Sequence, residues 1–173
     1  MSVNRRCFAM KLFKILAFAL LIFTVACSDE KKSNNETSSG NPTKSLVIYK
    51  QNTNEVKKGY FVEVADNRQE MAKGLMGRNK LDTDAGFLFD VNLIPSDMEI
   101  AMWMKDTLIP LDMLFIDKEG KIYFIYENAE PLSTNAIMAP SRPRAVLEIN
   151  GGQVKKFDIK IGDSIKAELF GNM

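Results

Sequence analysis

The fold is decided by the segment Met102-Trp103-Met104-Lys105-Asp106-Thr107-Leu108-Ile109-Pro110-Leu111-Asp112-Met113-Leu114-Phe115-Ile116-Asp117. It contains the only tryptophan of the chain and places a few polar residues between two apolar runs. Pro110 has no N–H to donate to a neighbouring strand, so we expect a strand, a corner and a second strand. Polar side chains between apolar strands belong at the rim of a barrel or sandwich. The pattern predicts that this rim, residues 103–112, is the functional surface.

Short β-rich runs on both sides extend this pattern along the chain. Strands are expected at residues 46–49, 59–65, 85–89, 98–105, 112–116, 121–127, 145–149 and 164–169. Asp66 is expected to cap a helix that runs to Met76, with Gly74 inside it at a cost of about 1 kcal/mol against alanine. A second short helix is expected at 153–158 and a long loop at 130–143. The chain is therefore predicted to be mainly β (α+β), a compact β-barrel or sandwich-like single domain with one or two short helices.

Composition excludes several classes of protein. The chain has 173 residues, enough for one domain with a hydrophobic core. It has no histidine, which excludes Ser-His-Asp and Cys-His catalysis and histidine-ligated zinc. Four of the 23 basic residues and none of the 22 acidic residues precede Ser28, which leaves 19 basic against 22 acidic residues, a net charge of −3, on the remainder. This balance argues against nucleic acid as the main partner, and we expect no cofactor.

The first 27 residues have the pattern of an export signal. Basic residues precede an apolar run from Ile15 to Ala26, which is short for a transmembrane span and typical of a secretory signal. The sequence Thr24-Val25-Ala26-Cys27 resembles a bacterial lipobox. The resemblance implies that Cys27 receives a diacylglyceryl group and that the chain is cleaved after Ala26. An ordinary signal peptide with an incidental cysteine is the alternative.

These features predict how the chain is divided and where the protein resides. We expect a lipoprotein signal peptide at residues 1–26, with Met10 as an alternative translation start, a disordered polar tether at 27–44 and a folded domain at 45–173. Acylated Cys27 would attach the exported protein to a lipid bilayer of the bacterial cell envelope. Ser28, rather than aspartate, follows the cysteine. By resemblance to lipoprotein sorting in Gram-negative bacteria, this favours the outer membrane over the inner membrane.

Several motifs together carry a resemblance to a known family. They are Gly74-Leu75-Met76-x-Arg78, Gly86-Phe87-Leu88-Phe89, Trp103-Met104-Lys105-Asp106-Thr107-x-Ile109-Pro110-Leu111-Asp112, Val146-Leu147-Glu148 with Gly151, and Ile161-Gly162-Asp163. Between Lys58 and Lys166 the chain resembles the DUF192 family, also called UPF0127. The resemblance implies a compact, mostly β, barrel-like domain and a family without an established biochemical function. At Asp106 the family usually has asparagine, so this chain adds a charge to the rim.

The candidate ligand-binding residues are Trp103, Lys105, Asp106, Thr107, Asp112, Arg78 and Glu148. Trp103 and its polar neighbours can form a ligand platform that combines an aromatic face, hydrogen-bond donors and a carboxylate. The alternative is a core tryptophan followed by a corner whose side chains bind backbone groups. Asp106 and Asp112 can be paired carboxylates for hydrolysis or for Ca²⁺ or Mg²⁺, or separate turn carboxylates that accept backbone N–H groups.

Three other groups of side chains have two interpretations each. The arginines suit anion recognition or surface ion pairs, and they are Arg68, Arg78, Arg142 and Arg144. Met98, Met102 and Met104 can ligate Cu(I), although methionines more often fill irregular cores. Glu148 lies within an apolar strand, so we expect it to be buried and paired with Lys105 or an arginine.

Three functions follow from these alternatives. The first is a ligand- or partner-binding β-domain whose rim recognises a small molecule, a glycan or an envelope protein. The second is a structural or assembly lipoprotein of the cell envelope without a small-molecule site. The third is a carboxylate-dependent hydrolase, which needs two of Asp106, Asp112 and Glu148 across one cleft. We rank binding first and catalysis last.

Overall fold

The computed structural model describes residues 43–173. The predicted signal peptide, the alternative start at Met10, the lipidation site at Cys27 and nearly all of the predicted tether lie outside the described residues. The first strand begins at Lys44, the residue that the sequence assigned to the end of the tether. Among residues 43–173, no helix has the length and hydrophobicity needed to cross a membrane.

Strands dominate the described part of the chain. They are β1 (Lys44–Tyr49), β2 (Val56–Ala65), β3 (Ala85–Asp90), β4 (Ala101–Met102), β5 (Leu111–Ile116), β6 (Ile122–Ala129), β7 (Ile137–Met138), β8 (Ala145–Asn150) and β9 (Ser164–Ala167). The two α-helices are α1 (Arg68–Lys73) and α2 (Gln153–Lys156), and 3₁₀-helices form at Val91–Leu93 and Glu168–Phe170. The prediction of a mainly β domain with two short helices is confirmed.

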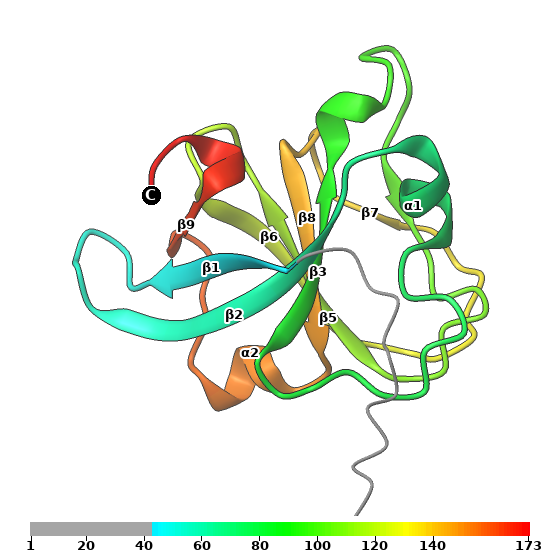
Figure 1. Ribbon diagram of the computed structural model, residues 1–173, viewed down its shortest axis with the longest axis horizontal. Helices are drawn as coiled ribbons and strands as arrows, with labels where there is room; N and C mark the ends of the chain where they lie inside the picture. Colours follow the sequence, from blue (N-terminus) through cyan, green and yellow to red (C-terminus); the bar gives the residue numbers. More distant parts are fainter. Residues whose placement is uncertain (1–42) are drawn as a thin grey trace, which may run out of the picture. The chain divides into compact units, whose positions relative to one another are not determined.

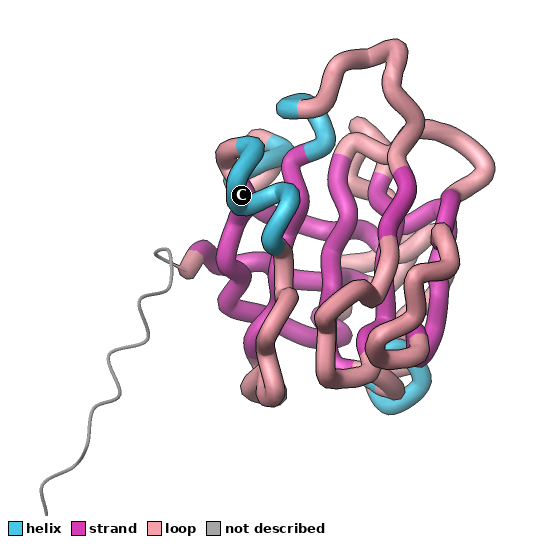
Figure 2. The backbone as a smooth tube through the Cα atoms, turned by 90° about the vertical axis from the view of Figure 1, so that its right-hand side faces the viewer, coloured by secondary structure: helices cyan, strands magenta, loops and turns pink. Residues whose placement is uncertain are grey.

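Seven strands form one curled sheet in the order β6-β5-β8-β3-β2-β1-β9 (Figure 1). Only β2 and β3 run parallel, and α1 lies in the connection between them. The two outermost strands of this order, β6 and β9, also approach each other. Ile122 N–H donates to the carbonyl of Asp163 (2.9 Å), and Ile165 N–H donates to the carbonyl of Gly120 (2.7 Å). The curvature, which can be followed in Figure 2, gives the domain its barrel-like form.

The larger sheet separates two apolar layers. The inner layer fills the curl and includes Leu46, Val62, Leu88, Leu114, Leu147 and Ile165. The outer layer lies on the other face and includes Phe87, Phe89, Met113, Phe115 and Val146. It is covered by residues 68–77, 91–109 and 130–139, which contribute Leu75, Ile100, Met104 and Ile137 to it. We call these three segments the cover; in Figure 1 its labelled elements α1 and β7 lie on the same side of the sheet.

Alternation along β8 decides where its one acidic side chain points. Leu147 and Ile149 belong to the inner layer, so Val146 and Glu148 face the outer layer. Glu148 is flanked in register by Phe87 of β3 and Met113 of β5. A carboxyl group is thereby placed at the centre of the sheet, on the face beneath the cover.

Several predicted boundaries were wrong, and each has a local reason. Asn67, not Asp66, caps α1, because its side chain accepts the N–H of Glu70 (3.0 Å). The helix ends at Lys73 because Gly74 adopts a φ of +47°. The strand expected at 98–105 shrinks to β4, which pairs only with β7, inside the region predicted to be a loop. Short cover segments pair with each other here instead of joining the larger sheet.

Candidate functional site

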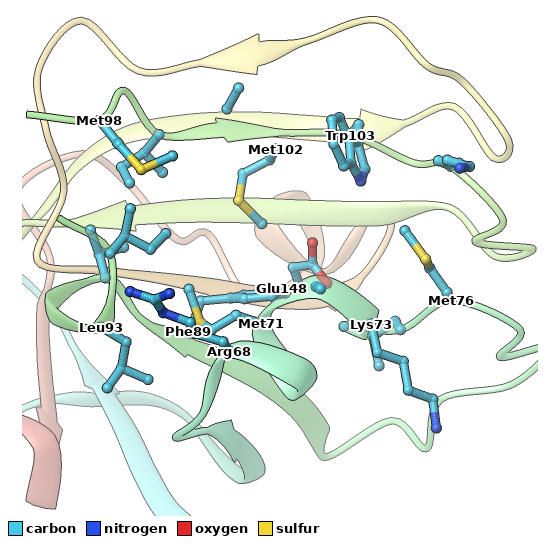
Figure 3. Close-up of a pocket in the computed structure, with 18 of the residues that line it drawn as sticks. Arg68, Met71, Lys73, Met76, Phe89, Leu93, Met98, Met102, Trp103 and Glu148 are labelled. Atoms are coloured by element: carbon cyan, nitrogen blue, oxygen red, sulfur yellow. The ribbon is translucent and has the colours of Figure 1, made fainter.

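A cavity of about 570 Å³ lies between the outer face of the larger sheet and the cover. Its walls are mostly apolar and come from α1 and the turn after it, from the end of β3, and from residues 91–107. The aliphatic, thioether and aromatic lining includes Met71, Leu75, Met76, Phe89, Leu93, Ile94, Met98, Met102 and Trp103 (Figure 3). One residue of the central strand β8 reaches the cavity, and it is Glu148.

Glu148 is buried without a partner. Only 4% of the residue is exposed. Among the described residues its carboxyl group makes no hydrogen bond and no ion pair, so the pair expected with Lys105 or an arginine is not formed. Burial raises the pKa of Glu148 to about 8. At pH 7 the group is therefore mainly protonated and can donate a hydrogen bond as well as accept one.

Trp103 faces the same cavity from the cover. The residue is 52% exposed, so the interpretation as a core tryptophan was wrong. In Figure 3 its ring and the carboxyl group of Glu148 both point into the space between residues 101–105 and α1. The next residue, Met104, is buried, and its N–H donates to the carbonyl of Ser133 (2.9 Å), which fixes this end of the cover.

Lys105 and Thr107 also line the cavity, but they differ in burial and in hydrogen bonding. The Lys105 side chain is exposed and has no hydrogen-bond or ion-pair partner in the described part of the chain. Thr107 is buried, and its hydroxyl donates to the carbonyl of Lys105 (3.4 Å). The structure thus brings together four of the predicted residues: Trp103, Lys105, Thr107 and Glu148.

Asp106 does not line the cavity. It is exposed and has a φ of +56°, in the left-handed region that aspartate and asparagine tolerate better than most residues. Its carbonyl accepts the N–H of Gly77 (2.7 Å), which links two segments of the cover. The asparagine that the family resemblance implies here would tolerate this backbone conformation as well, without a role for its amide as a donor.

Asp112 has a structural role on the other face of the sheet. Its carboxylate accepts the N–H groups of Asn128 (2.8 Å), Gly152 (3.1 Å) and Val154 (2.8 Å). It pairs in register with Ile149, one residue beyond Glu148, so the two acidic side chains point to opposite faces. Neither Asp106 nor Asp112 reaches the cavity, and the carboxylate pair that a hydrolase would need is not formed by these residues.

The arginines are mostly engaged elsewhere. Arg78 donates to both carboxylate oxygens of Glu63 (2.6 Å each) and does not line the cavity. Arg142 donates to the carbonyl of Ile94 (2.7 Å) and holds the segment after β3. Arg144 pairs with Asp90. Only Arg68 of the four lines the cavity.

Several cavity residues were not predicted as site residues. Lys73 and Met71 of α1 were not considered for the site, whereas Arg68 of the same helix was considered for anion recognition or a surface ion pair. Of the three methionines considered as copper ligands, Met98 and Met102 line the cavity while Met104 lies in the outer layer. Within residues 43–173, no group of three or more histidine, cysteine, aspartate or glutamate side chains is placed to hold a metal ion.

Comparison with known proteins places the chain in a family. The model of DUF192, described as an uncharacterized ACR, matches residues 49–167. One similar solved structure is the crystal structure of a protein from Sinorhizobium meliloti 1021 that is named as a candidate transcription regulator. It has a TM-score of 0.68 and 32% sequence identity, and the match covers 75% of this chain and 97% of that chain. The crystal structure of a protein of unknown function from Novosphingobium aromaticivorans DSM 12444 has a TM-score of 0.67 and 32% sequence identity. It covers 75% of this chain and 89% of that chain. No curated protein matches. The match across the folded domain shows that the chain belongs to the DUF192 family.

Proposed function

We propose that this domain binds a small amphipathic molecule in the cavity beneath the cover, with Glu148 as its deepest polar contact. The observation that carries the proposal is the buried carboxyl group of Glu148, which opens onto an apolar cavity and has no partner among the described residues. Its oxygens are open to the cavity rather than fully enclosed, and a polar group largely buried without a protein hydrogen bond costs free energy of folding. A ligand that hydrogen-bonds this carboxyl group would recover that cost.

The walls of the cavity suit such a ligand. Its volume of about 570 Å³ falls within the range of roughly 300–1,000 Å³ that is typical of small-molecule sites. Met71, Met76, Met98 and Met102 line it, and methionine side chains adapt to ligands of different shape. Trp103 adds a half-exposed aromatic face at the cover.

We also propose that the domain is held at a bilayer of the bacterial cell envelope by acylated Cys27. Support comes from the basic and apolar residues before Cys27 and from the lipobox-like sequence that ends in it. The polar residues from Ser28 to Thr43 would then form the tether, and the outer membrane is the favoured location. An anchored domain of this kind would meet amphipathic molecules near the membrane surface.

Energy transfer from Trp103 tests binding in the cavity, because Trp103 is the only tryptophan in the chain. The neutral apolar probe N-phenylnaphthylamine should quench Trp103 emission at saturable, low concentrations. Met102→Lys places a charge in the apolar wall and should weaken probe binding at least tenfold. Met138→Lys is the matched control, because Met138 is exposed on the paired strand β7 and does not line the cavity. Absence of saturable quenching, or equal binding by both variants, would refute the proposed function.

A further inference from the structure

We infer that the cavity selects an amphipathic anion, a molecule with an apolar body and a negatively charged group that is met by Arg68, Lys73 and Lys105. The inference rests on the proposed binding function and adds the charge of the ligand to it. An aliphatic carboxylate is the simplest molecule of this class.

The three cations are free to act on a ligand. Arg68, Lys73 and Lys105 all line the cavity, and the side chain of none has a hydrogen-bond or ion-pair partner in residues 43–173. Several other cations of the described chain are engaged, for example Arg78 with Glu63 and Lys57 with Asp163 (2.8 Å). Each unpaired cation beside an apolar surface favours an anionic group at that position.

The acidic groups of the cavity do not cancel this charge. Glu99 and Glu148 are the two acidic residues that line it. Because burial raises the pKa of Glu148 to about 8, this group is mainly uncharged at pH 7. Three cations against the single charge of Glu99 leave the lining with a net charge of +2. A protonated Glu148 can also donate a hydrogen bond to a ligand oxygen, which an ionised carboxylate cannot do.

The arrangement of the charges fits an amphiphile. Figure 3 shows Arg68 on the Leu93 side of the cavity and Lys73 on the Met76 side, with its ammonium group directed outward, and Glu148 between them. The surface between these groups is made of the methionine and aromatic side chains already described. An apolar body can therefore contact the walls while a charged group stays near a cation at the edge.

Competition among matched amphiphiles tests the inference. Decanoate, decanol and decylamine share one chain and differ in charge, and each would be titrated against bound N-phenylnaphthylamine. The protein is the full chain carrying Cys27→Ser, which blocks acylation and leaves residues 43–173 unchanged. Decanoate should displace the probe at about tenfold lower concentration than decanol, and decylamine should be the weakest competitor. Added salt should reduce the preference for decanoate.

Charge-removal variants connect the preference to the named residues. The triple variant Arg68→Gln/Lys73→Gln/Lys105→Gln should lose the preference for decanoate while it still binds the probe and decanol. A control triple variant, Lys118→Gln/Lys121→Gln/Lys155→Gln, removes three exposed cations that do not line the cavity and should keep the preference.

The outcomes separate the two proposals. If the probe binds but decanol or decylamine competes as well as decanoate, the inference about charge is wrong and the binding function stands. If the cavity triple variant keeps the preference for decanoate, Arg68, Lys73 and Lys105 do not cause it, and the inference is likewise wrong. If the probe does not bind, the proposed function fails, and this inference fails with it.

Discussion

Asp112 and Glu148 lie on neighbouring strands of one sheet and point to its opposite faces. Asp112 accepts hydrogen bonds from three backbone N–H groups at the end of the inner layer. Glu148, beneath the cover, has no such partner in the described part of the chain. The two carboxyl groups should therefore have opposite effects on the free energy of unfolding.

Glu148→Gln should stabilise the domain at neutral pH. The pKa of Glu148 is raised from 4.5 to about 8, so the folded state binds its proton more tightly than the unfolded state. The contribution of this group to stability is fully present below the unfolded pKa of 4.5 and is lost as the pH rises through about 8. At roughly 1.4 kcal/mol per pKa unit, about 2–3 kcal/mol should be lost between pH 5 and pH 7.

Urea melts of the wild type and of Glu148→Gln at several pH values measure this loss. The difference in unfolding free energy between the two proteins should be small at pH 5 and should grow in favour of the variant toward pH 8. Glu127→Gln, at an exposed position on β6, is the control and should follow the wild type. A difference that does not change with pH would show that Glu148 is ionised in the folded state.

Asp112→Asn should destabilise the domain by about 2–4 kcal/mol. The amide has one acceptor oxygen in place of two, and its NH₂ group would face a backbone N–H that Asp112 now satisfies. Chemical denaturation at pH 7 gives the value. Asp106→Asn is the matched control, because Asp106 is exposed and asparagine also tolerates its positive φ. Equal stabilities of the two variants would contradict the structural role of Asp112.

Trp103→Ala and Met104→Ala should differ although the residues are adjacent. Met104 is 1% exposed, and its loss should cost about 2–5 kcal/mol through transfer and cavity terms. Trp103 is half-exposed at a cavity, so its loss should cost about 1 kcal/mol or less and should weaken probe binding instead. Thermal melts measure the loss of stability, and the fluorescence of the probe itself, which needs no tryptophan donor, measures binding. A large loss of stability for Trp103→Ala would mean that the indole packs into the outer layer.

Gly74→Ala should disturb α1 and the cavity more than Gly77→Ala. Both glycines have positive φ, which costs an alanine roughly 1 kcal/mol. Only at Gly74 would the added Cβ approach another side chain, at 3.0 Å from Cζ of Phe89, whereas nothing lies within 4 Å at Gly77. Unfolding free energies and probe affinities of the two variants distinguish the two effects. Both variants share the cost of a positive φ, and only Gly74→Ala adds the contact with Phe89. If Gly77→Ala is the more damaging change, the position of α1 against Phe89 has been misjudged.

Cys27→Ser should abolish lipidation. Cys27 is the cysteine at the end of the apolar run, and serine lacks the thiol that accepts a diacylglyceryl group. Radiolabelled palmitate should enter the wild type and not the variant, while Cys7→Ser should be labelled like the wild type. Label that persists in Cys27→Ser would overturn the proposal that this protein is a lipoprotein.

The sequence alone predicted the fold class and the larger strands, because their apolar runs are bounded by clear turns. It also placed Trp103, Lys105 and Thr107 near one another, but it included Asp112 among the ligand-binding candidates and gave a turn carboxylate only as the alternative. These are local relationships, which spacing along the chain can reveal. The short pair β4 and β7 was missed because two-residue strands carry no periodic signal.

The cavity itself could not be predicted, because it is made by segments that are distant in the sequence. Arg68 and Met71 meet Met98 and Trp103 only after α1 and the segment 91–107 fold over the same face of the sheet. The partner expected for Glu148 was an inference from energetic cost alone. Such a cost predicts that a partner is needed, but it does not say that the partner belongs to the same chain.

The division of the sheet into two faces has a consequence for how this family can change over time. No residue of the inner layer lines the cavity, so the side chains inside the curl differ from those that would contact a ligand. Substitutions of cavity residues that belong to neither layer, such as Met98 and Trp103, should therefore alter the proposed binding with little effect on the barrel. Homologues could diverge in what they bind while sharing one architecture, and the same separation makes the domain a suitable scaffold for engineering new specificities.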